Sequence, residues 1–324
     1  MLRRYPMTAL ALVVAVLAAL TLPAIAQQKT TLVFSAGPTG GSWTPMAGAT
    51  AEVIKKKFPE LDVQVEPGAA LVNMEKVRND KADLAWSMTN VLSDARNGVG
   101  QWKGKQTDKA LFVANYYANV WQLVVAAESD IKSVKDLKGK PVALPARGNT
   151  SLADGWENIL KINGMTLNDL GPKSYGPVSA NAEAMKNRQA VAVGWFTVVP
   201  GSFVLDLGST MKLRMIGITK EEMAQLQKIN PGFVPHVIKA GTYKDQGITD
   251  DVHTFQSPTI LIASSKTPAD VVYKVTKAIV EGREDFVNVS PVMKGVTPAD
   301  FAQSHGMPMH PGAEKYYKEI GALK

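Results

Sequence analysis

The first part of the chain after residue 30 alternates between two hydrophobic periods. Short apolar or alternating runs, typical of strands, are separated by stretches whose apolar positions recur with the spacing of a helix face. The expected strands are residues 31–36, 61–66 and 83–88, and the expected helices are residues 45–58, capped by Thr44, and a segment around Leu71, Met74 and Val77. Strands that alternate with helices predict a mostly parallel sheet, with ligand sites beyond the carboxyl ends of its strands.

A second unit of the same kind follows the first. Its expected strands are residues 121–127, 141–144, 190–196 and 213–217, and its expected helices are residues 152–164 and 181–187. The chain then returns to an expected strand, residues 259–262, and a long expected helix, residues 268–286. Each unit begins with a strand, a polar loop and a helix, so we expect an α/β protein made of two related lobes. A chain of 324 residues is also longer than one hydrophobic core usually supports.

The first 26 residues have the pattern of an export signal. Arg3 and Arg4 precede an uncharged apolar stretch, residues 7–22, which leads through small residues to an Ala-x-Ala cleavage site. We expect cleavage after Ala26 and a mature protein in the periplasm, with an uncleaved membrane anchor as the alternative. No Cys stands at the cleavage site, so no N-terminal lipid anchor is expected.

Composition and charge narrow the chemistry. The chain has no Cys, which excludes disulfides, thiol nucleophiles and Cys-bound metals. Its net charge is +7, and two of its 36 basic residues belong to the expected signal. The one tight basic run, residues 55–57, is expected in the last turn of a helix, where cations oppose the helix dipole. Because no aromatic residues are interleaved with it, nucleic acid is not an expected partner.

Motifs for catalysis and for metal binding are absent from the sequence. None of the four His residues lies in H-E-x-x-H, and the stretch Gly-Met-Pro-Met between His305 and His310 prevents their pairing on one helix face. No G-x-S-x-G nucleophile motif occurs. We therefore expect no enzyme activity, no metal and no cofactor, although a secreted hydrolase on the same scaffold remains an alternative.

Two polar loops that open helices are the candidate ligand contacts. Glycines let backbone N–H groups approach a ligand, and a helix amino terminus favours an anion. The first loop offers Thr39, Gly41, Ser42 and Trp43, and the second offers Arg147, Asn149, Thr150 and Ser151. Neither loop matches a nucleotide-binding motif. The alternative for each loop is a tight turn with nothing bound.

Other candidate contacts follow the strands of both units. The aromatic candidates are Trp43, Trp86 and Trp195, and the neutral polar candidates are Asn73, Ser87, Thr89 and Asn90. Core packing is the alternative for each Trp, and helix capping is the alternative for the polar residues.

Several short motifs occur together in a characteristic order. Residues 37–43 read Gly-Pro-Thr-Gly-Gly-Ser-Trp, residues 72–73 read Val-Asn, residues 81–85 read Lys-Ala-Asp-Leu-Ala and residues 136–140 read Asp-Leu-Lys-Gly-Lys. Gly-Thr-Tyr at 241–243, residues 271–278 and the closing His-Pro-Gly-Ala-Glu-Lys-Tyr-Tyr-Lys-Glu-Ile-Gly at 310–321 follow. Together they resemble the solute-binding receptors of TRAP transporters of the TAXI type (TRAP-associated extracytoplasmic immunogenic proteins), over almost the whole mature chain.

The resemblance implies a monomeric, two-lobed periplasmic binding protein that closes over a small anionic solute and delivers it to TRAP membrane permease subunits. It implies a carboxylate solute, similar to 2-oxoglutarate or to glutamate and glutamine. The same fold serves receptors of ABC importers and of sensor kinases, which remain the alternatives. We expect a first lobe of residues 27–124 and 258–324 and a second lobe of residues 125–257, joined by two crossing strands.

The chain departs from the family pattern at two places. The family's G-S-G-T is replaced by residues 148–151, Gly-Asn-Thr-Ser, and its D-A is replaced by Val191-Ala192. Loss of that carboxylate, with Arg147 near the second loop, leads to the hypothesis that the solute lacks an ammonium group.

Overall fold

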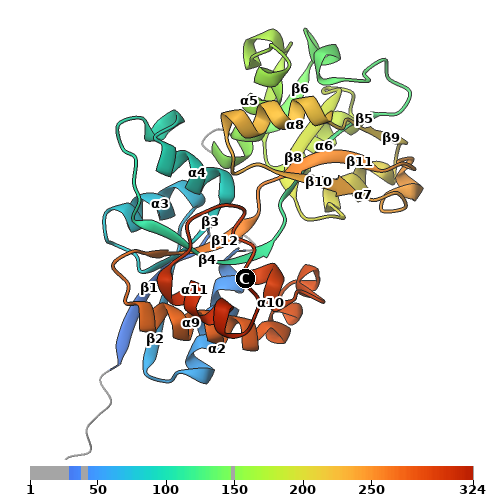
Figure 1. The fold of residues 1–324 in the computed structure, drawn as a ribbon. Helices are drawn as coiled ribbons and strands as arrows, with labels where there is room; N and C mark the ends of the chain where they lie inside the picture. Colours follow the sequence, from blue (N-terminus) through green and yellow to red (C-terminus); the bar gives the residue numbers. More distant parts are fainter. Residues whose placement is uncertain (1–28, 38–42, 147–149, 324) are drawn as a thin grey trace, which may run out of the picture.

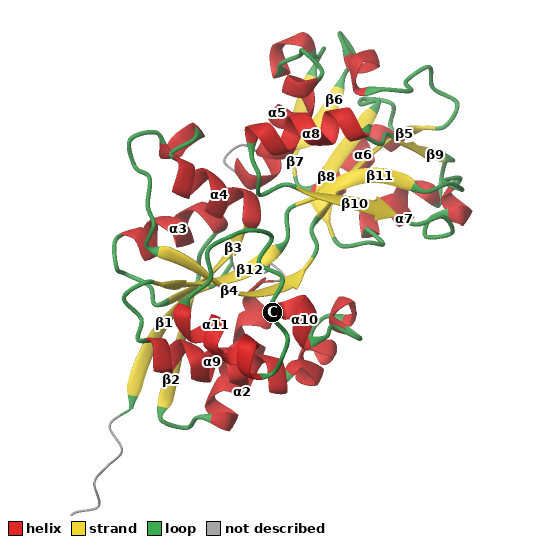
Figure 2. Cartoon of the chain, in the orientation of Figure 1, coloured by secondary structure: helices red, strands yellow, loops and turns green. Residues whose placement is uncertain are grey.

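Two β-sheets, each with helices on both faces, make up the protein (Figure 1). The computed structural model describes residues 29–37, 43–146 and 150–323. The sheets lie in separate lobes (Figure 2), and the chain crosses between them at residues 118–119 and 257–258. We call the residues before the first crossing and after the second crossing the first lobe. The residues between the two crossings form the second lobe.

The first lobe has a five-stranded sheet of order β2-β1-β3-β12-β4. Its strands are β1 (Thr30–Ser35), β2 (Leu61–Glu66), β3 (Leu84–Met88), β4 (Ala110–Tyr117) and β12 (Thr259–Ser264). One face packs against α2 (Trp43–Lys57), α9 (Ala269–Glu281), α10 (Pro298–Phe301) and α11 (Pro311–Glu319), and the other against α3 (Ala70–Arg78) and α4 (Thr89–Asn97). On the first face Trp86 is fully buried, and its ring centroid lies 4.4 Å from that of Tyr116. The alternative that Trp86 packs in the core is therefore confirmed.

The second lobe has a sheet of order β10-β11-β5-β8-β6-β7, with β9 paired to β5. Its strands are β5 (Val120–Ala126), β6 (Val142–Pro145), β7 (Lys173–Gly176), β8 (Ala192–Thr197), β9 (Leu213–Met215), β10 (Val234–Ile238) and β11 (Val252–Gln256). One face packs against α5 (Thr150–Ile162) and α8 (Lys220–Ile229), and the other against α6 (Val178–Lys186) and α7 (Ser202–Gly208). Trp121 and Trp156 pack edge to face in its core, with ring centroids 5.6 Å apart.

Short 3₁₀ helices occupy several connections of both lobes. They are η1 (Gly100–Trp102), η2 (Val134–Leu137), η3 (Leu167–Asp169), η4 (Lys244–Gln246), η5 (Arg283–Asn288) and η6 (Pro291–Met293). The predicted long helix over residues 268–286 is therefore α9 followed by η5.

The predicted α/β fold with two lobes is confirmed, and both sheets are mixed. β1 pairs in parallel with β2 and β3, and β6 with β7 and β8. β12 is antiparallel to β3 and β4, and β5 is antiparallel to β8 and β11. β5 and β12 directly follow the two crossings. Each therefore enters its sheet from the junction and runs against strands that end there.

Two predicted boundaries differ from the structure. β5 pairs with β8 from Val120 to Val125, so residues 120–124, which were expected in the first lobe, belong to the second sheet. Thr44 does not cap α2, because this helix already begins at Trp43, whose indole N–H donates to Thr259. The prediction that residues 55–57 form the last turn of this helix is confirmed.

Among the described residues, no helix is long and apolar enough to cross a membrane. The predicted export signal, residues 1–26, lies outside them.

Candidate functional site

The carboxyl ends of strands from both lobes lie at the junction between the lobes. β1 and β3 end there in the first lobe, and β6 and β8 end there in the second. The helices α2, α4 and α5 follow these strands. Helix amino termini carry unpaired N–H groups and partial positive charge. This edge of a two-lobed α/β protein is therefore suited to holding a small polar molecule.

Of the four candidates in the first loop, Trp43 is the one within the described residues. It is the first residue of α2 and lies at the junction. Its half-buried indole donates from Nε1 to Thr259 Oγ1 at 3.3 Å. Asn119, in the first crossing, donates from Nδ2 to the same Thr259 oxygen at 2.6 Å and to the carbonyl oxygen of Ser257 at 3.3 Å. Trp43 is thus tied to both crossings, and its contact with a ligand stays a prediction.

Asn73 and Ser87 lie inside the first lobe instead of at the junction surface. Both side chains are fully buried. Asn73 donates from Nδ2 to the carbonyl oxygens of Ala36 and Trp86, each at 2.7 Å, and its Oδ1 accepts from the hydroxyl of Ser35 at 2.7 Å. These bonds attach α3 to β1 and β3. In this conformation Asn73 stabilises the lobe and has no hydrogen bond left for a solute.

Asn90 connects the two lobes. Its Oδ1 accepts from the hydroxyl of Ser257 at 2.6 Å, within the second crossing. Its Nδ2 donates to Asp154 Oδ2 at 3.4 Å, and its carbonyl oxygen accepts from Asn230 Nδ2 at 3.0 Å. Asp154 and Asn230 both belong to the second lobe, on α5 and directly after α8. Asn90 therefore lies at the junction, although its side chain is fully buried there.

Two carboxylates meet at the same place. Asp94, one turn after Asn90 on α4, accepts from Asn230 Nδ2 at 2.9 Å. Burial raises the pKa of Asp94 to about 6. Burial, followed by the neighbouring charge of Asp94 and then that of Glu157, raises the pKa of Asp154 to about 7. Within the described ranges neither carboxylate forms an ion pair, so no opposite charge there offsets its desolvation.

A glycine completes this contact between α4 and the second lobe. Thr89, at the start of α4, donates from its hydroxyl to the carbonyl oxygen of Gly232 at 2.6 Å. A Cβ at Gly232 would overlap the Thr89 carbonyl oxygen, so only glycine fits this close approach. We call the set formed by Thr89, Asn90, Asp94, Asp154, Asn230 and Gly232 the polar seam.

The remaining predicted contacts lie on β8, at the start of α5 or outside the described residues. Trp195 lies on β8, where it is partly buried and packs with residues on the α6 side of the sheet. Thr150 and Ser151 begin α5. Thr39, Gly41, Ser42, Arg147 and Asn149 lie outside the described residues.

The position at which the family's carboxylate is missing does not lie at the junction, so its loss is not evidence against an ammonium group on the solute. Val191-Ala192, where the family pattern has a carboxylate, lies at the start of β8. Ala192 pairs with Val125, whereas Thr197 at the other end of β8 pairs with Val120 beside the crossing. The missing carboxylate is therefore a strand length away from the junction. Asp154 brings a carboxylate to the junction instead.

Sequence reasoning missed Asp94, Asp154, Asn230 and Gly232. Asp94 and Asp154 lie outside the apolar stripes of their helices. An acidic residue at such a position is expected on the solvent-exposed face of a helix. The Asn-Pro-Gly turn at residues 230–232 was the one local signal, since it ends a helix and carries a glycine. Nothing in the sequence indicates that this turn lies against α4.

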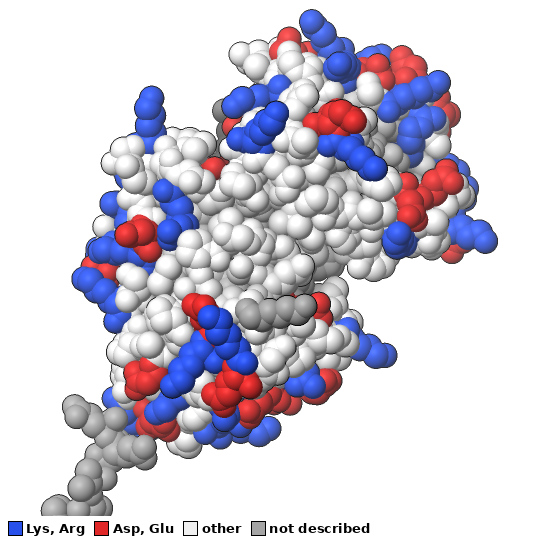
Figure 3. Space-filling view, viewed as in Figure 1, with Lys and Arg blue, Asp and Glu red and all other residues white. Residues whose placement is uncertain are grey.

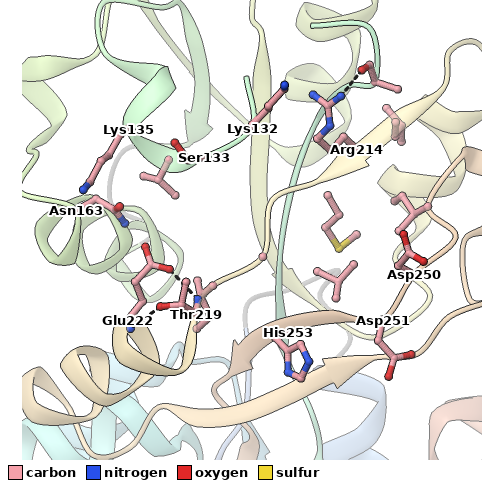
Figure 4. Close-up of a pocket in the computed structure, with 18 of the residues that line it drawn as sticks. Lys132, Ser133, Lys135, Asn163, Arg214, Thr219, Glu222, Asp250, Asp251 and His253 are labelled. Atoms are coloured by element: carbon pink, nitrogen blue, oxygen red, sulfur yellow. Dashed lines mark hydrogen bonds between the residues drawn. The ribbon is translucent and has the colours of Figure 1, made fainter. Parts of the chain in front are cut away.

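A cavity of about 920 Å³ lies in the second lobe alone (Figure 4). Lys132, Lys135 and Arg214 line it together with acidic residues such as Glu222. Arg214 already donates to three backbone carbonyls, and Glu222 accepts from the backbone N–H of Thr219 at 2.7 Å. With charges of both signs and groups bonded within the lobe, this cavity does not present one consistent set of ligand contacts.

No group of three or more His, Asp or Glu side chains suitable for a metal ion occurs among the described residues.

Two α/β lobes, two chain crossings and a polar junction at the strand ends define the fold of two-lobed periplasmic binding proteins. The chain belongs to the NMT1-like family, which it matches over residues 34–321. Its fold is similar to that of PhnD1 from Prochlorococcus marinus (MIT 9301) in complex with methylphosphonate, with 11% identity and a TM-score of 0.55 over 90% of this chain and 99% of that one. It is also similar to XAC2383 from Xanthomonas citri bound to ATP, with 11% identity and a TM-score of 0.52 over 91% and 96% of the two chains. At these identities the likeness concerns the fold.

Proposed function

We propose that the protein is an exported receptor that captures a small solute between its lobes and delivers it to an importer in the membrane. The observation that carries this proposal is the junction itself. Strand ends and helix amino termini of both lobes meet there, and Asn90 bonds to both the second crossing and the second lobe. A solute that contacts both lobes favours the closed arrangement by the contacts that it makes only there.

Solute capture without turnover is the direct test. The purified protein is screened with organic acids and amino acids by thermal shift and by tryptophan fluorescence, since Trp43 lies at the junction. A solute that raises Tm, quenches or shifts the fluorescence and is recovered unchanged supports a receptor. Conversion of a compound in the same panel would support the alternative, a secreted hydrolase. Native mass spectrometry of protein purified without refolding identifies a retained solute.

For the solute class we propose a small carboxylate. The support is the place of the amino termini of α2 and α5 after strands that end at the junction, together with the resemblance to TAXI-type receptors. Arg147, which lies outside the described residues, is the candidate counter-charge. Asp154 at the junction favours a solute that also carries an amino group, such as glutamate or glutamine. Calorimetry with glutamate, glutamine and 2-oxoglutarate separates the cases, because tight binding of 2-oxoglutarate alone would exclude a role for Asp154 as partner of an ammonium group.

For the partner we propose TRAP permease subunits, with an ABC importer or a sensor kinase as the alternative. Uptake of the identified solute by vesicles that contain one candidate permease at a time, with and without this protein, distinguishes them.

For the location we propose the periplasm. Sequencing of the protein released from that compartment should begin at Gln27.

A further inference from the structure

An open groove at the junction has different chemistry from the polar seam. It is a groove of about 330 Å³, lined by residues of both lobes and of both crossings. Asn115 and His305 come from the first lobe, and Val198 and His236 come from the second. We call it the hinge groove.

Two buried polar atoms of the hinge groove lack partners. Asn115 is 9% exposed; its Nδ2 donates to the carbonyl oxygen of Asp300 at 3.1 Å, but its Oδ1 has no hydrogen-bond partner among the described residues. In the same part of the structure, the buried Nε2 of His305 also has none. A buried polar atom without a partner is destabilising, and native proteins contain few of them. Here the two atoms belong to residues that line the same groove.

The backbone is irregular next to Asn115 and at His305. In the pairing of β4 with β12, Asn115 lies opposite Ile260 and Tyr117 lies opposite Thr259, which leaves Tyr116 as the extra residue of a bulge. His305 has φ = 53°, in the left-handed region that non-glycine residues seldom adopt. Bulges and such strained residues concentrate at functional sites.

Charge is absent from the described lining of the groove. Besides Asn115 and the two His residues, the side chains that line the groove are apolar or neutral, among them Val198, Val296 and Gln256. Burial lowers the pKa of His236 and of His305, which keeps both imidazoles neutral near pH 7. Figure 3 agrees, since Lys, Arg, Asp and Glu gather on the outer parts of both lobes and the surface between the lobes is mostly uncharged on that face.

We propose that the hinge groove is a second binding site, for a small uncharged molecule that carries an N–H donor on an apolar body, as an aromatic primary amide does. The amide N–H would donate to Asn115 Oδ1, and its carbonyl would accept from His305 in the tautomer protonated at Nε2. Val198 and Val296 would contact the apolar body. Charged solutes, which the proposed junction site would take, are disfavoured here because no counter-charge lines the groove.

The test uses benzamide as the probe and the four His residues as reporters. With ¹³C-labelled His, His236 and His305 report on the groove, while the exposed His253 and the buried His310 report on other places. His→Gln variants assign the signals. We expect benzamide to shift the His236 and His305 signals saturably, with a millimolar Kd typical of so small a ligand. Acetophenone, which has the same shape without the N–H donor, and charged benzoate should bind at least tenfold more weakly.

Two variants keep the outcome decisive. Val296→Trp, at a half-buried wall of the groove, should abolish the benzamide shifts by filling the space, and Asn115→Leu should weaken binding about tenfold by removing the acceptor. An unchanged His310 signal shows that each variant is folded. The proposal is overturned if benzamide shifts neither groove signal, if it shifts all four alike, or if acetophenone binds as well. None of these results bears on solute capture, which is measured by a different signal.

Discussion

The lobe junction has two parts of opposite character, the polar seam and the hinge groove. The polar seam is closed by hydrogen bonds from α4 to the second lobe and contains two carboxylates, Asp94 and Asp154. The hinge groove is open, has no charged lining among the described residues and leaves Asn115 Oδ1 unpaired. Contact across the seam should therefore depend on steric fit and on pH. Binding in the groove should depend on the shape of the molecule and on its hydrogen bond to Asn115, with little effect of charge.

The largest effect is expected from Gly232→Ala. The added Cβ would overlap the Thr89 carbonyl oxygen, so either the turn or α4 must shift. We expect a loss of about 2–3 kcal/mol in the free energy of unfolding and a larger radius of gyration in small-angle scattering, as the lobes separate. Gly48→Ala is the matched control, because nothing lies within 4 Å of a Cβ there and alanine favours the helix. Equal stability of both variants would mean that the seam does not hold the lobes together.

The next largest effect concerns pH. Asp94 and Asp154 have folded pKa values of about 6 and about 7, above the ordinary 3.8. The native state therefore binds protons that the unfolded state has released. This penalty is absent below pH 4 and complete above pH 7, so stability should fall as pH rises through that window.

Asp154→Asn should remove most of this fall. Because the side chain is partly exposed, we expect the variant to gain about 1–2 kcal/mol relative to wild type between pH 5 and pH 8. Urea unfolding at both pH values measures the gain. Asp206→Asn, which removes an exposed carboxylate paired with Lys186, should keep the wild-type pH dependence. An unchanged slope in the Asp154 variant would contradict the assignment of the penalty to this carboxyl.

Asn119→Ala tests the first crossing, between the polar seam and the hinge groove. The substitution removes hydrogen bonds to Thr259 Oγ1 and to the carbonyl oxygen of Ser257. Since water can replace part of them, we expect a loss of about 1 kcal/mol, measured by urea unfolding. If the loss were undetectable, Trp43 and Thr259 would hold the crossing without Asn119.

The smallest effect is expected on the groove side. Gln303 lines the hinge groove and is exposed, so Gln303→Ala should change the free energy of unfolding by less than about 0.5 kcal/mol. The same urea measurements as for Asn119→Ala provide the comparison. A loss as large as that of Asn119→Ala would show that the groove side also carries stabilising polar contacts.

Sequence patterns predicted elements better than they predicted sites. The alternation over residues 61–66 coincides with β2, and the apolar spacing around Met74 coincides with α3. These signals are local, because a strand or a helix face is set by neighbours along the chain. Asn73 shows the limit, since the same sequence position fits a ligand contact or a buried link between α3 and the sheet. Its four hydrogen-bonding partners in this structure all lie within the first lobe, and three of them are far away in sequence.

The sequence by itself determined the α/β class, the two units and most strand and helix positions, because these follow from the period of hydrophobic residues. Tertiary structure decided the direction of β5 and β12, the place where the lobes touch, and the identity of the residues there. Asp94 and Asp154 are 60 positions apart and look like ordinary surface acids. Only the approach of α4 to α5 removes water from both and makes their charge matter.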